Sequence, residues 1–180
     1  MNIFEHGMPI LQSPPLRDWL VLGGFILLIF ALLMLADWLR QRRVMSPEGT
    51  RKTVHLLTGI FILTCPFIFH TSLPPLVLAA LFVAVNCLAL RYRLFAGIHV
   101  SSRPTLGTVF YPLAFLVLIV LFWEGNQLAL LIGMSLLAIA DVFAALVGEN
   151  VKAPIMLPLH GDRKSLQGTL AMLASSVLLV

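Results

Sequence analysis

One aspartate, Asp141, stands inside an otherwise apolar stretch, LLAIADVFAALVGEN, over residues 136–150. A carboxylate at the centre of a bilayer costs roughly 2.5–3.5 kcal/mol on insertion scales, so a compensating interaction is expected. That interaction is a salt bridge to His55 or Arg51, a structural hydrogen bond, or a role in chemistry. A carboxylate at this depth can hold Mg²⁺ or act as a base, provided that water and phosphate groups reach it.

Cations and a histidine gather on a second predicted helix. The dipeptide Ser-Pro at residues 46–47 is typical of a helix N-cap followed by proline at the first helical position. On that helix Arg51, His55 and Gly59 recur every four residues and therefore share one face. Lys52 lies beside this face. A cation, an imidazole and a glycine in this order can bind phosphate, and the glycine lets another backbone approach.

Three other segments add candidate groups. Arg103 precedes a proline in the segment SSRPTLGTVFYP. Lys164 directly precedes Ser165, a good N-cap for a last helix whose free N–H groups and partial positive charge attract phosphate. On the helix that carries the aspartate, Gly148 shares the face of the carboxylate, and Glu149 follows at the helix end. Together these clusters suit a nucleoside triphosphate with Mg²⁺.

The composition identifies the chain as an integral membrane protein. Of its 180 residues, 59% are hydrophobic and 11% charged, whereas a soluble domain carries about a quarter charged residues. We expect one all-α transmembrane domain over residues 1–180, because five apolar stretches are long enough, or nearly so, to cross about 30 Å of hydrocarbon as helices. These predicted spans are residues 19–38, 53–70, 73–90, 108–123 and 127–147. A sixth span starts near residue 169 and is too short to cross, which predicts a chain cut short in its last span.

The basic residues predict the orientation of the chain. Eleven of the twelve Lys and Arg residues fall in three alternate connections, 39–52, 91–107 and 148–168. The positive-inside rule assigns these connections to the cytoplasm and the N-terminus to the outside. All the candidate clusters then share the cytoplasmic face of a multi-pass protein. Topology and anionic lipid head groups account for the net charge of +4, so no nucleic-acid partner is expected.

Taken in order, these residues resemble the polyprenol kinase family, which includes dolichol, phytol and farnesol kinases and a CTP-dependent diacylglycerol kinase. The resemblance covers roughly residues 46–172. It is carried by Arg51-Lys52-x-x-His55-x-x-x-Gly59, by Arg103 with Gly107 and Tyr111-Pro112, by Ala140-Asp141-x-x-Ala144 to Gly148, and by Lys164-Ser165-x-x-Gly168.

The resemblance implies a membrane kinase that uses CTP, or another nucleoside triphosphate, to phosphorylate the hydroxyl of a polyprenol, another isoprenoid alcohol or diacylglycerol. On this hypothesis Asp141 and His55 are catalytic, and Asp141 with Glu149 holds Mg²⁺ on the triphosphate. His55 either hydrogen-bonds the transferring group or accepts the alcohol proton. The predicted nucleotide- and phosphate-binding residues are Arg51, Lys52, Arg103, Gly148, Lys164, Ser165 and Gly168.

Two other classes of function remain open from the sequence. A phosphatidate or lipid-phosphate cytidylyltransferase would use the same nucleotide at the same membrane face. A non-enzymatic transporter or membrane scaffold would use Asp141 as an ion or proton site. A transporter would place its polar groups near the midplane on broken helices, which suits these clusters less well.

Overall fold

The computed structural model describes residues 13–92, 107–157 and 164–180, where the regular structure is helical apart from one isolated β-bridge between Met156 and Ser165. The predicted all-α fold is therefore confirmed for these ranges. Each predicted span coincides with a helix, with boundaries that differ by a few residues. The elements are α1 (Leu16–Gln41), α2 (Pro47–Ile68), α3 (Leu73–Tyr92), α4 (Gly107–Phe122), α5 (Gln127–Ser135), η2 (Leu136–Ala140), α6 (Asp141–Asn150) and α7 (Leu166–Leu179).

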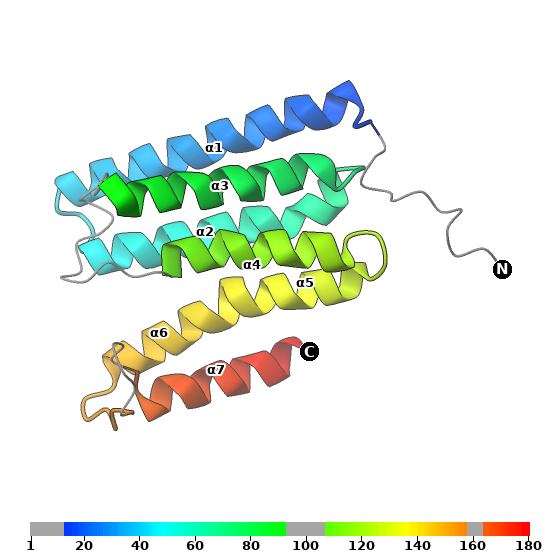
Figure 1. The fold of residues 1–180 in the computed structure, drawn as a ribbon. Helices are drawn as coiled ribbons and strands as arrows, with labels where there is room; N and C mark the ends of the chain where they lie inside the picture. The colour runs from blue at the N-terminus through cyan, green and yellow to red at the C-terminus, as the bar shows by residue number, and fades with distance from the viewer. Residues whose placement is uncertain (1–12, 93–106, 158–163) are drawn as a thin grey trace.

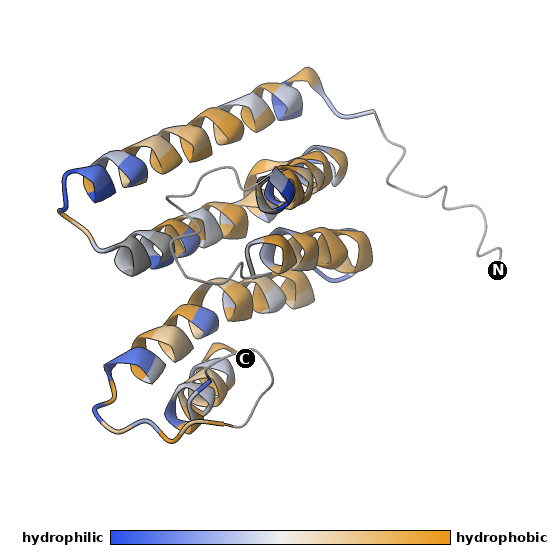
Figure 2. Cartoon of the chain, turned by 60° about the vertical axis from the view of Figure 1, so that its left-hand side comes forward, coloured by the Kyte–Doolittle hydropathy of each residue, from blue (hydrophilic) through white to orange (hydrophobic). Residues whose placement is uncertain are grey.

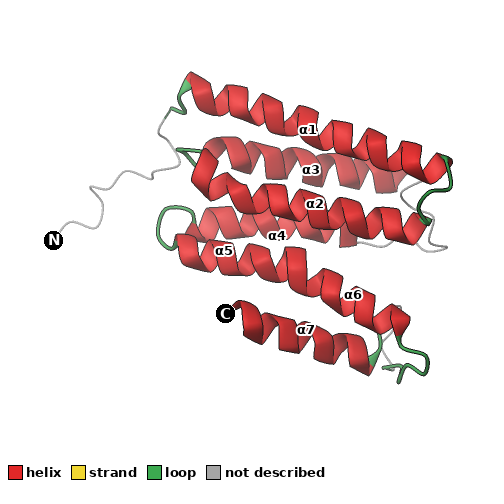
Figure 3. Ribbon diagram, turned by 180° about the vertical axis from the view of Figure 1, so that it is seen from behind, coloured by secondary structure: helices red, strands yellow, loops and turns green. Residues whose placement is uncertain are grey.

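The helices lie side by side, and the chain reverses direction from α1 to α2, to α3, to α4, to α5 and again from α6 to α7 (Figures 1 and 3). The elements α5, η2 and α6 follow one another without a break and form one rod, against which α7 packs. The α1–α2 connection and the α6–α7 connection therefore lie at the same end of the bundle (Figure 1). We call it the basic end, because it carries Arg40, Arg42, Arg43, Lys52, Lys152 and Lys164.

Polar side chains begin three of the helices in the expected way. The hydroxyl of Ser46 accepts a hydrogen bond from the Gly49 N–H at 3.0 Å, so the predicted N-cap of α2 is confirmed. The hydroxyl of Ser165 accepts from the Gly168 N–H at 3.1 Å and confirms the predicted N-cap of α7. Asn126 caps α5 in the same manner. Each cap satisfies a donor that the first helical turn leaves without a partner.

Apolar side chains from α1 to α5 form a common core that holds the middle of the bundle together. Its most deeply buried members are Cys65, Leu78, Phe115, Ile119, Leu130 and Met134. Hydrophobic colour also covers much of the outer surface of the helices, while hydrophilic colour is concentrated near helix ends (Figure 2). Many large apolar side chains are exposed on that surface, which is the arrangement expected of helices that face lipid.

Two of the described helical segments are long and apolar enough to cross a membrane, Leu16–Gln41 and Gln127–Asn150. The second is the continuous α5–η2–α6 rod. Four other apolar helices are shorter, at Lys52–Ile68, Leu73–Ala89, Thr108–Phe122 and Leu166–Leu179. The predicted number of crossings and the outside position of the N-terminus therefore stay predictions.

A buried carboxylate fastens α1 to the α2–α3 turn at the end of the bundle opposite the basic end. The side chain of Asp18 has no exposed surface. One of its oxygens accepts from the backbone N–H of His70 at 2.9 Å and from the backbone N–H and hydroxyl of Thr71, both at 3.2 Å. The other faces the His70 ring at 3.0 Å. The two backbone donors of the turn are thus satisfied by a side chain from α1.

Candidate active site

The predicted cationic face of α2 lies along the rod that carries Asp141. Gly59 faces Ala138, His55 faces Leu137 and Asp141, and Lys52 forms an ion pair with Glu149. From Lys52 to Gly59 the contacts move from residue 149 on the rod back to residues 137–141. Helix α2 and the rod therefore run antiparallel. This register brings His55 and Asp141 together, although 86 positions separate them in the chain.

Gly59 allows the close approach that its position predicts. A Cβ atom at Gly59 would lie 2.5 Å from the Cβ of Ala138 and 2.7 Å from the hydroxyl of Tyr111. Both distances are shorter than real carbon contacts, so no larger residue fits without movement of α4 or the rod. Three segments of the chain therefore meet at this glycine, one helical turn beyond His55.

A single π-turn in the rod orients the histidine. The N–H of Asp141 donates to the carbonyl oxygen of Leu136 instead of to that of Leu137, its partner in a regular α-helix. The Leu137 oxygen accepts from His55 Nε2 at 3.1 Å. Because a carbonyl can only accept, Nε2 carries the hydrogen, and in the neutral ring Nδ1 keeps its lone pair. A general base at this position would therefore use Nδ1.

Asp141 faces the same ring but does not hydrogen-bond to it. Its Oδ2 atom lies 3.8 Å from His55 Nε2, and the Asp141 side chain is 54% exposed. At this distance a protonated imidazole is stabilised electrostatically while the carboxylate stays open to other partners. The salt bridge to His55 that the sequence left open and a chemical role for Asp141 are therefore compatible in this geometry.

The predicted sharing of a metal ion by Glu149 and Asp141 stays a prediction, and the course of α6 does not favour it. The two residues are eight positions apart on one helix, which is about 12 Å along its axis. Glu149 is instead paired with Lys52, whose side chain is 14% exposed. No group of three or more metal-binding side chains occurs in the part of the chain that is described. Asp141 alone fits the mode in which Mg²⁺ takes one carboxylate and otherwise phosphate oxygens and water.

Helix packing accounts for the positions of Gly148 and Gly168. A Cβ atom at Gly168 would lie 2.9 Å from the carbonyl oxygen of Ala144 and 3.2 Å from the Cα of Gly148. At Gly148 it would lie 3.0 Å from the Ser165 hydroxyl. The two glycines therefore form the contact between α6 and the first turn of α7. Their predicted roles in nucleotide binding, and that of Ser165, stay predictions.

The first turn of α7 has few free donors for an anion. The N–H of Leu166 donates to Ile155, that of Gly168 to the Ser165 hydroxyl, and that of Thr169 to the Ser165 carbonyl. Three of the first N–H groups are thus occupied within the chain. Lys164 is exposed just before this turn and remains free to approach a phosphate.

Two predicted cations have no described side-chain position. Arg103 lies outside the described residues, and only the backbone of Arg51, within α2, is described. Of the four predicted phosphate-binding cations, Lys52 and Lys164 are placed at the basic end. The predicted role of Arg51 and Arg103 in neutralising phosphate remains a proposal.

Tyr111 belongs to the site although its role could not be assigned from the sequence. Its ring packs against His55 with centroids 4.2 Å apart and planes tilted by 53°. The only available signal was the Tyr-Pro dipeptide at residues 111–112, which is equally typical of an aromatic residue at a membrane interface.

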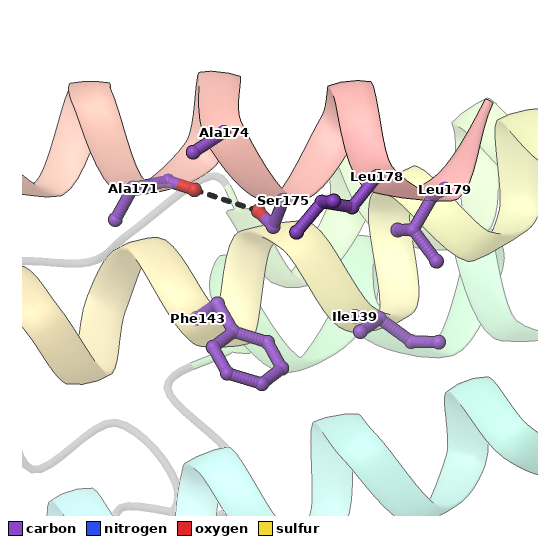
Figure 4. A pocket seen from close by; sticks show the side chains of 7 residues that line it. All are labelled: Ile139, Phe143, Ala171, Ala174, Ser175, Leu178 and Leu179. Atoms are coloured by element: carbon purple, nitrogen blue, oxygen red, sulfur yellow. Dashed lines mark hydrogen bonds between the residues drawn. The ribbon is translucent and has the colours of Figure 1, made fainter.

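An apolar groove of about 370 Å³ lies between the rod and α7, lined by Ile139, Phe143, Ala171, Ala174, Ser175, Leu178 and Leu179 (Figure 4). Its polar side chain, Ser175, donates to the carbonyl oxygen of Ala171 at 2.7 Å. The side chains that line the groove therefore offer no free polar group for chemistry.

Comparison with known proteins gives consistent relatives. The chain is 30% identical to the phytol kinase of Synechocystis sp., in an alignment that covers 95% of this chain and 74% of that protein. It is 28% identical to a probable chloroplastic phytol kinase of Triticum aestivum over 91% of this chain, and 29% identical to phytol kinase 1 of Arabidopsis thaliana over 84%. The chain spans 58% and 52% of the lengths of these two plant proteins. No protein-family model and no solved structure matches it.

Proposed function

Because the chain belongs to the polyprenol and phytol kinase family, we propose that it is a membrane lipid-alcohol kinase. It transfers the γ-phosphate of CTP, or of another nucleoside triphosphate, to the hydroxyl group of phytol or a related isoprenoid alcohol. The observation that carries this proposal is the His55–Asp141 pair, held by the π-turn beside a basic end of the bundle.

In the proposed reaction His55 is the general base. The oxygen of the lipid alcohol forms the new bond to the γ-phosphorus, and its proton passes to His55 Nδ1. The bond from the γ-phosphorus to the bridging oxygen breaks, and its electron pair leaves on the nucleoside diphosphate. Asp141, 3.8 Å from Nε2, stabilises the imidazolium that forms, and the Leu137 carbonyl keeps the ring in place.

Charge neutralisation on the triphosphate is proposed for the four cations that the sequence predicts. Arg51, Lys52, Arg103 and Lys164 would contact phosphate oxygens, with Lys52 leaving its pairing with Glu149 to do so. The nucleotide would also contact the first turn of α7 near Ser165.

Asp141 is the residue that would hold Mg²⁺, since one of its oxygens faces His55 and the other has no described hydrogen-bond partner. When bound, the ion neutralises charge on the transferring phosphate. Glu149 would contribute only if α6 changed its course, because it lies about 12 Å along the helix from Asp141.

We propose a multi-pass membrane protein whose basic end faces the cytoplasm or its equivalent. The nucleotide would approach this end from water, and the isoprenoid chain would lie among the apolar helix surfaces. The exposed apolar side chains of the helices support this arrangement.

The test uses purified protein in lipid with isoprenoid alcohols, diacylglycerol and phosphatidate, and with CTP labelled separately at the α- or γ-phosphorus. Label that reaches lipid from the γ position alone is the expected result, and the labelled product identifies the substrate. Label from the α position would make the protein a cytidylyltransferase. Transfer from neither would remove the kinase proposal.

A matched pair of variants then tests Asp141. Asp141→Asn is expected to abolish transfer while the protein stays folded. Asp37→Asn changes an aspartate at the end of α1 that pairs with Arg40, outside the proposed machinery, and should retain transfer. Equal activity in both variants would remove Asp141 from the mechanism.

A further inference from the structure

The hydroxyl of Tyr111 is buried and has no hydrogen-bond partner among the described residues. It points at Gly59, where a Cβ atom would lie 2.7 Å from it, and Ala138 closes the same position from the rod. The Tyr111 ring meanwhile contacts the ring of His55. A buried polar atom without a described partner therefore lies next to Gly59 and Ala138, directly beside the proposed base.

Such an atom lowers the stability of the fold. A hydroxyl that is buried on folding loses its hydrogen bonds to water, and without a new partner this loss of free energy is not offset. Nearly all buried polar atoms in proteins are therefore paired. Phenylalanine would place the same ring against His55 without this loss. A buried water molecule needs two or more polar partners, and the residues that lie next to the hydroxyl at this point, Gly59 and Ala138, offer no polar side chain. Packing alone thus favours phenylalanine over tyrosine here.

The position of the hydroxyl indicates which substrate it would meet. Gly59 follows His55 by one turn of α2, about 6 Å farther from the basic end. Nucleotide phosphates reach His55 from the basic end, whereas a lipid alcohol reaches it from the apolar middle of the bundle. The Tyr111 hydroxyl lies on the side from which the lipid comes.

Resting on the kinase function above, we propose that Tyr111 binds the reacting alcohol. Its hydroxyl donates a hydrogen bond to the oxygen of the lipid hydroxyl while that oxygen gives its proton to His55 Nδ1. The alcohol reaches it when Ala138 moves aside.

The test compares Tyr111→Phe with Tyr92→Phe, a change at the other tyrosine of the chain, which is 66% exposed at the end of α3. For Tyr111→Phe we expect kcat/KM for the lipid alcohol to fall about tenfold, the size of one lost hydrogen bond, with the KM for the nucleotide unchanged. We also expect its Tm to rise by about 2–4 °C. Tyr92→Phe should change neither quantity.

Two results would overturn the proposal: unchanged kcat/KM for the alcohol in Tyr111→Phe, or a lower Tm, which would mean that the hydroxyl has a structural partner. If the wild-type protein transferred no phosphate, the kinase function would fail separately. In that case, binding of the alcohol is measured separately, as the increase in Tm of the protein on addition of phytol. A smaller rise in Tyr111→Phe than in the wild type supports alcohol binding at Tyr111, and an equal rise refutes it.

Discussion

Replacement of Asp18 by alanine should destabilise the bundle without touching the candidate active site. The change leaves the backbone N–H groups of His70 and Thr71 without their acceptor, and each such buried donor costs about 1–3 kcal/mol. Water can re-enter at this end of the bundle once the carboxylate is gone. We therefore expect the free energy of unfolding to fall by about 2–3 kcal/mol in total, near the lower limit for two such donors. This corresponds to a decrease in Tm of about 5–10 °C.

The assay follows the reaction of Cys65 with a thiol-reactive dye during heating, in a Cys87→Ser background. Cys65 is fully buried in the core, whereas Cys87 is exposed. Asp37→Ala is the matched control on the same helix, because Asp37 bonds to Arg40 and Gln41 near the helix end. Equal Tm values for the two alanine variants would refute the role given to Asp18. Transfer per folded molecule should be the same in both.

Three further predictions concern the site itself. His55→Gln should keep a hydrogen-bond donor for Leu137 and thus the fold, but should lower lipid phosphorylation at least about 100-fold; measurable transfer at the wild-type rate would exclude a base at this position. Gly168→Ala should cost about 1–3 kcal/mol in thermal unfolding through its contact with the rod, with nucleotide affinity of the folded fraction unchanged; weakened affinity alone would instead support direct nucleotide binding. Exchanging Lys52 and Glu149 should leave stability within about 1 kcal/mol of the wild type yet raise the KM for nucleotide, and an unchanged KM would limit Lys52 to a structural ion pair.

Much of the fold could be predicted from the sequence because its determinants are local. Apolar stretches of 16 or more residues specify helices, and the Ser-Pro pair at 46–47 and Ser165 specify where two of them begin. The four-residue spacing of His55 and Gly59 fixes their common face in any helix. These statements need only neighbouring residues, so they survive unchanged in the three-dimensional structure.

Apart from the pairing of His55 with Asp141, which the sequence offered as one of several alternatives, the partners of these residues could not be predicted, because they depend on how helices distant in the chain pack together. The π-turn changes one backbone hydrogen bond and directs the Leu137 carbonyl toward His55. No residue pattern in the sequence predicts this change. The same packing places Gly148 and Gly168 in the contact between two helices, and it leaves the Tyr111 hydroxyl without a partner among the described residues. The sequence by itself determined which helices form and which side chains share a face. Only the tertiary structure decided which of those faces meet, since the contact between α2 and the rod joins atoms whose residues lie about eighty positions apart.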